Sequence, residues 1–248
     1  MKFDWSRRRV LYGGLIVVPA AMCGSIAQAQ AHDGCWVGED RLHSQAPAQT
    51  TNPLDDEIIA RSGIEGLDLA LLQTLVRLSN LFGVLPGFVF YRERGQPNAK
   101  ATNRDLTGSR PDGTVMLGIK LVRELLALEL HPDAAVVAVC AHEFAHILSY
   151  SNGMIDRLRP TGASQLRAEQ FADYMAGYFA GRRRLDKPDF PAVVFATTTQ
   201  MYGGSTHGTP DQRSSAVQEG YLSAYLRHLE PQAATVRALD YALAIPVG

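Results

Sequence analysis

The segment His142-Glu143-Phe144-Ala145-His146, set within an apolar stretch from Pro132 to Gly153, decides the fold of this chain. Pro132 suits the first turn of a helix, and Asp133 offsets the positive end of the helix dipole. Asn152-Gly153 supplies a stop signal at the other end. The pattern therefore predicts one long buried helix. Its apolar side chains are Val136, Val137, Cys140, Phe144, Ile147 and Leu148.

The two histidines of this segment have the spacing of metal ligands. Residues four apart lie one turn above the other on a helix, so His142 and His146 can bind one zinc ion together. Glu143 then lies beside any water on that metal, where it can act as a general base. A chance occurrence of the pattern is the alternative, and the sequence downstream argues against it.

A second amphipathic stretch, from Gln165 to Phe179, offers the third ligand that a catalytic zinc site needs. Glu169 and Asp173 lie one turn apart on one face of it. A turn between Ser151 and Gly162 would return an antiparallel helix and bring Glu169 beside the two histidines. We therefore predict Glu169 as the third ligand and Asp173 as the acceptor of a ligand histidine's ring N–H. A solvated acidic strip is the alternative interpretation.

These motifs resemble a known family. His-Glu-Phe-Ala-His, followed by Glu169-Gln-Phe-Ala-Asp173, is similar to the HtpX-like and CAAX-prenyl-protease type of zinc metallopeptidases, a gluzincin group. Asn98-Ala99-Lys100-Ala101, followed by the segment Gly113–Gly118, resembles the edge-strand region ahead of that family's active-site helix. The resemblance covers roughly residues 55 to 230. It implies a zincin-type metallopeptidase domain.

A late segment adds to the resemblance. Ser205-Thr206-His207, with Arg213 six residues after the histidine, is similar to the family's Ser-Thr-His-Pro segment. It departs in one place, because Gly208 stands where the family usually has proline and Pro210 is displaced by two. We predict that His207 stabilises the oxyanion as a second donor besides zinc, and that Arg213 positions His207 or the substrate.

The rest of the chain predicts a mostly helical α+β domain with a small β-sheet beside the active-site helix. Expected strands are Val84–Arg92 and Thr114–Ile119, separated by a polar, turn-rich loop from Gly95 to Gly113. An irregular region is expected from Lys187 to Gly204. Further helices are expected at Ile58–Phe82, Leu121–Leu130, Gln212–Leu229 and Gln232–Ala244.

Composition limits the class of partner. The chain has 248 residues, of which 46% are apolar, so it can bury a substantial core. Its formal net charge is −1, which argues neither for nucleic acid nor for an anionic membrane surface as a partner.

The N-terminal residues predict export. Residues 1–31 combine Arg7-Arg8-Arg9, a short apolar run and small-residue cleavage sites ending at Ala29 or Ala31. This pattern predicts a signal peptide, either twin-arginine or ordinary secretory in type, and no stable membrane span after its removal. Residues 32–53 are expected to form a loosely ordered leader and residues 54–248 the metallopeptidase domain. The protein is expected to be periplasmic or secreted in a bacterium.

Two cysteines follow the expected cleavage site. Cys140 lies on the apolar face of the long helix, which favours a buried free thiol. Cys35 falls in the leader, and a disulfide between the two is the alternative in an oxidising compartment.

The predicted function is that of an exported zinc metalloendopeptidase, with protein quality control as its expected setting. Glu143 takes a proton from the zinc-activated water and hands it to the leaving amine. The strand Thr114–Ile119 is expected to offer a sheet edge that pairs with an extended polypeptide substrate. One zinc ion per chain is the expected cofactor. The family resemblance is the argument for protein substrates.

Two other functions stay open. The domain could bind misfolded polypeptides and use zinc structurally, with little turnover. Glu143 argues against this alternative, because a binding module has no use for a water-activating carboxylate. A zinc hydrolase of non-peptide amides would need the same ligands, so the ligands alone do not exclude it.

Overall fold

The structure, a computed structural model, describes residues 57–160, 164–201 and 207–246. The predicted signal peptide (1–31), the leader (32–53) with Cys35, and the pair Ser205-Thr206 lie outside these residues. The described part of the chain is an α+β domain, mostly helical, with one small mixed sheet. This coarse fold class is the one that the sequence predicts.

Four strands form the sheet, in the order β1-β2-β4-β3. β1 (Glu57–Ile59) pairs antiparallel with β2 (Gly87–Arg92), and β2 runs parallel to β4 (Thr114–Gly118). β3 (Ala99–Thr102) pairs antiparallel with β4 and forms the edge of the sheet that contacts the long helix. β4, with a strand on each side, is buried along its whole length.

Three expectations for this half of the chain are wrong. The sequence predicts a helix from Ile58, but Ile58 pairs with Tyr91 in β1, and the first helix begins at Leu67. β3 lies inside the segment Gly95–Gly113, which the sequence predicts as a loop. Because β3 covers β4, the strand predicted at Thr114–Ile119 is interior and cannot be the edge that pairs with a substrate. β3 forms this edge of the sheet instead.

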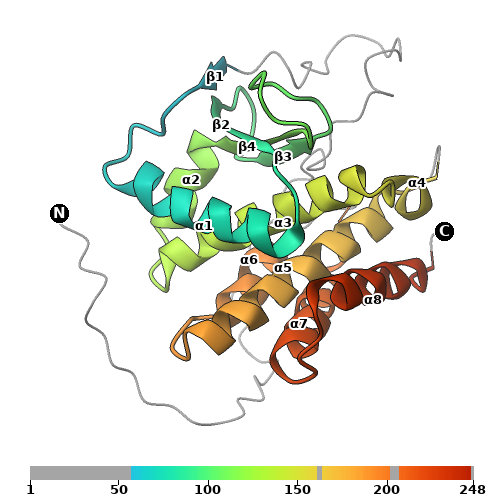
Figure 1. Ribbon diagram of the computed structural model, residues 1–248. Coiled ribbons are helices and arrows are strands. Elements are labelled where there is room, and N and C mark those ends of the chain that lie inside the picture. Colours follow the sequence, from blue (N-terminus) through green and yellow to red (C-terminus); the bar gives the residue numbers. More distant parts are fainter. Residues whose placement is uncertain (1–56, 161–163, 202–206, 247–248) are drawn as a thin grey trace.

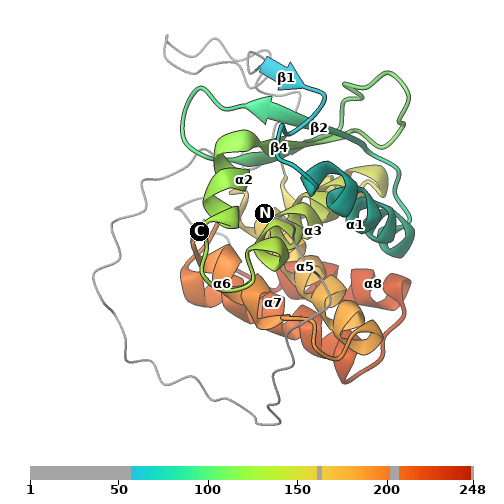
Figure 2. The same cartoon turned by 90° about the vertical axis from the view of Figure 1, so that its left-hand side faces the viewer.

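Helices build the rest of the domain. Figures 1 and 2 show the sheet at one end of the molecule, α3 in the middle, and α5, α7 and α8 beyond α3. The sequence predicts irregular chain between Lys187 and Gly204, but a helix, α6, forms there and packs against α3 and α7. The helices are α1 (Leu67–Phe82), α2 (Ile119–Leu126), α3 (Pro132–Ser151), α4 (Ile155–Leu158), α5 (Leu166–Asp186), α6 (Val193–Met201), α7 (Pro210–Tyr225) and α8 (Pro231–Leu243).

α3 begins and ends where the sequence predicts. Pro132 is its first residue, and Asn152 caps its end before Gly153, whose φ is 63°. Its middle turns are buried, with β3, β4 and α5 among the elements that contact it. By length and composition alone α3 could cross a membrane, but most of it is buried inside the domain, as is usual for a core helix.

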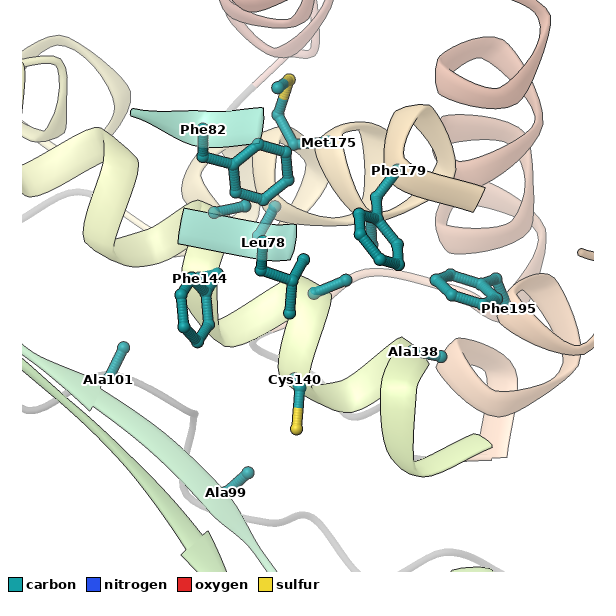
Figure 3. Close-up of a cluster of buried hydrophobic side chains, with 14 of the residues drawn as sticks. Leu78, Phe82, Ala99, Ala101, Ala138, Cys140, Phe144, Met175, Phe179 and Phe195 are labelled. Atoms are coloured by element: carbon teal, nitrogen blue, oxygen red, sulfur yellow. The ribbon is translucent and has the colours of Figure 1, made fainter. Parts of the chain in front are cut away.

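The core of the domain surrounds α3 (Figure 3). Phe144 and Cys140 of α3 lie toward β3, which contributes Ala99 and Ala101. The small alanine side chains let the strand lie close to the helix. Cys140 is a buried free thiol, as the sequence predicts, and burial raises the pKa of that thiol far above its usual value.

α5 and α7 approach each other so closely that glycine is required at the contact. A Cβ atom on Gly177 of α5 would overlap the backbone carbonyl of Val217. One on Gly220 of α7 would overlap the carbonyl of Tyr174. The two helix backbones therefore touch directly, and this contact helps to bring Arg213 of α7 beside Asp173 of α5.

Candidate metal centre

Two histidine side chains of α3 meet at the centre of the domain. His142 and His146 are one turn apart, and both are buried. Their Nε2 atoms lie 3.1 Å apart, and their rings are nearly perpendicular, at 85°. The helix therefore presents two imidazole nitrogens to a single point.

Glu169 of α5 completes a triangle of donor atoms. Its Oε2 lies 3.2 Å from Nε2 of His142, and its Oε1 lies 3.6 Å from Nε2 of His146. Tetrahedral zinc with bonds of about 2.0–2.1 Å holds its ligand atoms about 3.3 Å apart, which these separations match. His142, His146 and Glu169 thus form a buried group that could hold a metal ion.

The Glu169 carboxylate is a buried anion. Within the part of the chain that the structure describes, neither oxygen accepts a hydrogen bond of good geometry. Burial alone would raise the pKa of this carboxyl, but His207 and His146 outweigh burial and hold the pKa well below its usual range. A buried carboxylate beside imidazole nitrogens is a group that could hold a cation.

Asp173, one turn after Glu169, orients one of the histidines. Its Oδ1 lies 2.9 Å from Nδ1 of His142. When Nδ1 donates its proton to this carboxylate, the lone pair of Nε2 is left for a metal ion. His146 differs, because its Nδ1 is buried and has no hydrogen-bond partner among the described residues.

Arg213 of α7 holds the other side of Asp173. Its Nε donates to Oδ2 at 2.7 Å, and its Nη2 donates to Oδ1 at 2.8 Å. Burial alone would raise the pKa of Asp173, but the Arg213 guanidinium outweighs it and lowers the pKa. The sequence predicts that Arg213 positions His207 or the substrate, and this stays a prediction. The structure connects Arg213, through Asp173, to His142.

His207 reaches the same cluster from the residues before α7. Its Nε2 lies 3.5 Å from Oε2 of Glu169, and its backbone carbonyl accepts a hydrogen bond from Nε2 of Gln170 at 3.3 Å. Burial lowers the pKa of His207, although Glu169 opposes this. Gly208 has a φ of 95°, which proline cannot adopt because its ring holds φ near −65°. The positive φ thus explains why glycine, and not proline, occupies position 208.

A cavity opens beside the three candidate ligands. His142, Glu143, His207 and Arg213 line it, together with the start of β3 at Ala99. Glu143 is buried and belongs to the cavity wall, not to the triangle of ligand atoms. The carboxylate that follows His142 in sequence thus lines the same cavity as the candidate ligands.

Sequence reasoning missed two residues of this site. Gln170 anchors the backbone of His207, and its position between two predicted site carboxylates was a usable signal. Thr198 of α6 lines the cavity. Its place in the cavity could not be predicted, because the sequence does not predict α6, the helix on which Thr198 lies.

No family model matches the chain, and no curated protein or solved structure matches it either. The family resemblance based on the motifs therefore stays a prediction. The argument for function rests on the geometry of the site itself.

Proposed function

We propose that this chain is a zinc-dependent metalloendopeptidase of the HtpX-like and CAAX-prenyl-protease type, with a zincin-type fold. The observation that carries the proposal is the buried triangle of His142, His146 and Glu169, with Glu143 on the wall of the adjoining cavity. Three protein ligands leave a fourth position open, as catalytic zinc sites require.

The donor set supports zinc as the metal. Two imidazoles and one carboxylate are the ligands of many hydrolytic zinc sites, whereas magnesium and calcium prefer oxygen ligands. The hydrogen bond from His142 to Asp173 is the usual outer support of such a ligand. We expect one zinc ion per chain.

Glu143 would act as the general base. When bound, zinc polarises the scissile carbonyl and lowers the pKa of the attacking water. Glu143 takes a proton from that water and passes it to the nitrogen of the leaving amine, which restores the carboxylate. His207, which lines the same cavity, would donate a ring N–H to the oxygen that gains negative charge.

β3 is the proposed docking edge for an extended polypeptide. It is an edge strand of the sheet, and its first residue, Ala99, lines the cavity that contains Glu143. A peptide that adds a strand to β3 would run past Glu143. The N-terminal pattern supports an exported protein, for which we propose a role in periplasmic or extracellular protein quality control.

The test is hydrolysis of an unfolded protein by the purified, zinc-loaded chain. We expect turnover that a chelator abolishes and zinc restores. Glu143→Gln should keep the zinc and the fold but lower turnover by about 10²–10⁴-fold, because an amide cannot accept the proton. Glu129→Gln, at an exposed glutamate between α2 and α3, is the matched control and should behave as wild type.

Two outcomes would contradict the proposal. Wild-type turnover in Glu143→Gln, with contaminating proteases excluded, would mean that Glu143 is not the base. Absence of turnover in the zinc-loaded wild type, together with binding of unfolded protein, would favour a polypeptide-binding module.

A further inference from the structure

Besides its metal-site residues, the cavity has an uncharged wall. Figure 3 shows Ala138, one turn before His142 on α3, beside the helix that carries Phe195, which is α6. The wall thus lies next to the residues proposed to cleave the peptide bond. Three helices form it, through Leu121 of α2, Ala138 and Val139 of α3, and Thr198 and Thr199 of α6.

One polar group of this wall is unsatisfied. Thr198 is only 1% exposed, and in residues 57–160, 164–201 and 207–246 its hydroxyl has no hydrogen-bond partner. The adjacent threonines differ. The Thr197 hydroxyl donates to the Val194 carbonyl and the Thr199 hydroxyl to the Ala196 carbonyl, each at 3.0 Å. A buried hydroxyl without a partner is unfavourable, so a group bound in the cavity that supplies one gains affinity.

We propose that Thr198 determines which substrate side chain binds beside the scissile bond. It selects a neutral side chain that can form a hydrogen bond, namely that of Asn, Gln, Ser or Thr. This inference rests on the proposed function, since it assumes that the cavity receives a peptide. The aliphatic atoms of Leu121, Ala138 and Val139 contact the substrate side chain, and its amide or hydroxyl exchanges a hydrogen bond with Thr198.

Other side chains fit this wall less well. A purely aliphatic side chain fills the space but leaves the Thr198 hydroxyl unpaired. A charged side chain is disfavoured, because the wall offers no counter-charge. The Arg213 guanidinium, on the metal side of the cavity, is bound to Asp173. Burial of an unpaired charge is costly.

The experiment measures cleavage preference. A peptide mixture is digested by the zinc-loaded wild type, and the cleaved bonds are located by mass spectrometry. Matched peptides with Gln, Leu, Lys or Glu at the selective position then give kcat/KM for each variant. We expect Thr198→Val to lose about tenfold on the Gln peptide and little on the Leu peptide. Thr198→Ser keeps the hydroxyl and should retain the preference, and Thr197→Val, on the exposed side of α6, should leave it unchanged.

Thermal unfolding provides a readout that does not depend on catalysis. Thr198→Val should unfold at the same or a higher temperature, because a methyl group replaces an unpaired hydroxyl. A clear decrease would show that the hydroxyl has a partner in the folded protein and would overturn the inference.

The two proposals fail in different ways. If the wild type cleaves peptides but Thr198→Val has the same preference, the role of Thr198 is wrong and the proposed function stands. A wild-type preference for charged or purely aliphatic side chains at every position near the cleaved bond would also overturn that role. If the zinc-loaded wild type cleaves nothing, the proposed function fails and the role of Thr198 fails with it.

Discussion

Arg213 binds both oxygens of the Asp173 carboxylate, at 2.7 Å from Nε and 2.8 Å from Nη2, although the two residues lie 40 positions apart in sequence. Asp173 in turn lies 2.9 Å from Nδ1 of His142. The orientation of His142 on α3 therefore depends on a side chain of α7.

Loss of the Arg213 charge should destabilise the fold. We expect Arg213→Met to lower the free energy of unfolding of the metal-free protein by about 3–5 kcal/mol, because Asp173 stays buried without its partner. Urea unfolding followed by circular dichroism measures this change. Arg92→Met is the control, since Arg92 pairs with Glu57 at the surface and exposed pairs contribute about 0–1 kcal/mol. Equal effects of the two variants would contradict the importance of the buried pair.

Removal of the third ligand should remove the metal. We expect Glu169→Ala to lose zinc on dialysis, while Asp173→Ala weakens zinc affinity by about 10- to 100-fold without abolishing binding. Elemental analysis and competition with a chromogenic chelator measure the two effects. Full zinc occupancy of Glu169→Ala would mean that another residue is the third ligand.

His207 should matter for turnover and not for metal content. If it donates to the oxyanion, His207→Ala should lower kcat by about a hundredfold or more, with KM little changed. Gln170→Leu should lower kcat less, because it removes the hydrogen bond that anchors the His207 carbonyl. Steady-state kinetics beside zinc analysis separates these effects. Near-normal turnover of His207→Ala would exclude the oxyanion role.

An added side-chain atom at the α5–α7 contact should destabilise the fold. Gly220→Ala places a methyl group against the carbonyl of Tyr174, so we expect a loss of about 1–3 kcal/mol or more in stability. Gly95→Ala is the matched control, because among the described residues nothing lies within 4 Å of the added atom. Thermal and urea unfolding of both variants provide the comparison. Equal stability of the two would show that the helices separate easily.

The carboxyl group of Asp105, in the loop before β4, should titrate at unusually low pH. Hydrogen bonds from the backbone of Arg110, from the Thr107 side chain and from further backbone amides hold the pKa of Asp105 at about 2, against about 3.9 in an unfolded chain. A lowered folded-state pKa stabilises the protein above about pH 4, and this contribution is lost as the pH falls through about 2. Carboxyl NMR of the folded protein gives the midpoint. A value near 3.9 would contradict the hydrogen-bonded loop, and Asp105→Asn should lack this titration.

The sequence predicted those parts of the fold that local signals specify. The ends of α3 follow from Pro132 and Asn152-Gly153, which act within a few residues. The meeting of His142 and His146 follows from helix geometry alone. The return of Glu169 to the same point needs only that α5 runs back beside α3, and the short helix α4 lies within this connection.

The parts that were missed depend on distant contacts. α6 contains Thr197, Thr198 and Thr199, whose branched side chains disfavour helices, yet Phe195 packs against Phe179 and Phe190 in the fold. β3 is short and rich in alanine, so its strand character comes from pairing with β4. The bond between Arg213 and Asp173 requires the glycine contact of α5 and α7, which no local pattern predicts.

The position of Arg213 late in the chain has a consequence for protein synthesis. The ribosome completes α3 and α5, with all three ligand residues, before it makes α7. Until then the Asp173 carboxylate has no guanidinium beside it, and His142 has no fixed support. The three candidate ligands are thus all synthesised before the side chain that holds Asp173, so the final orientation of His142 has to wait for α7.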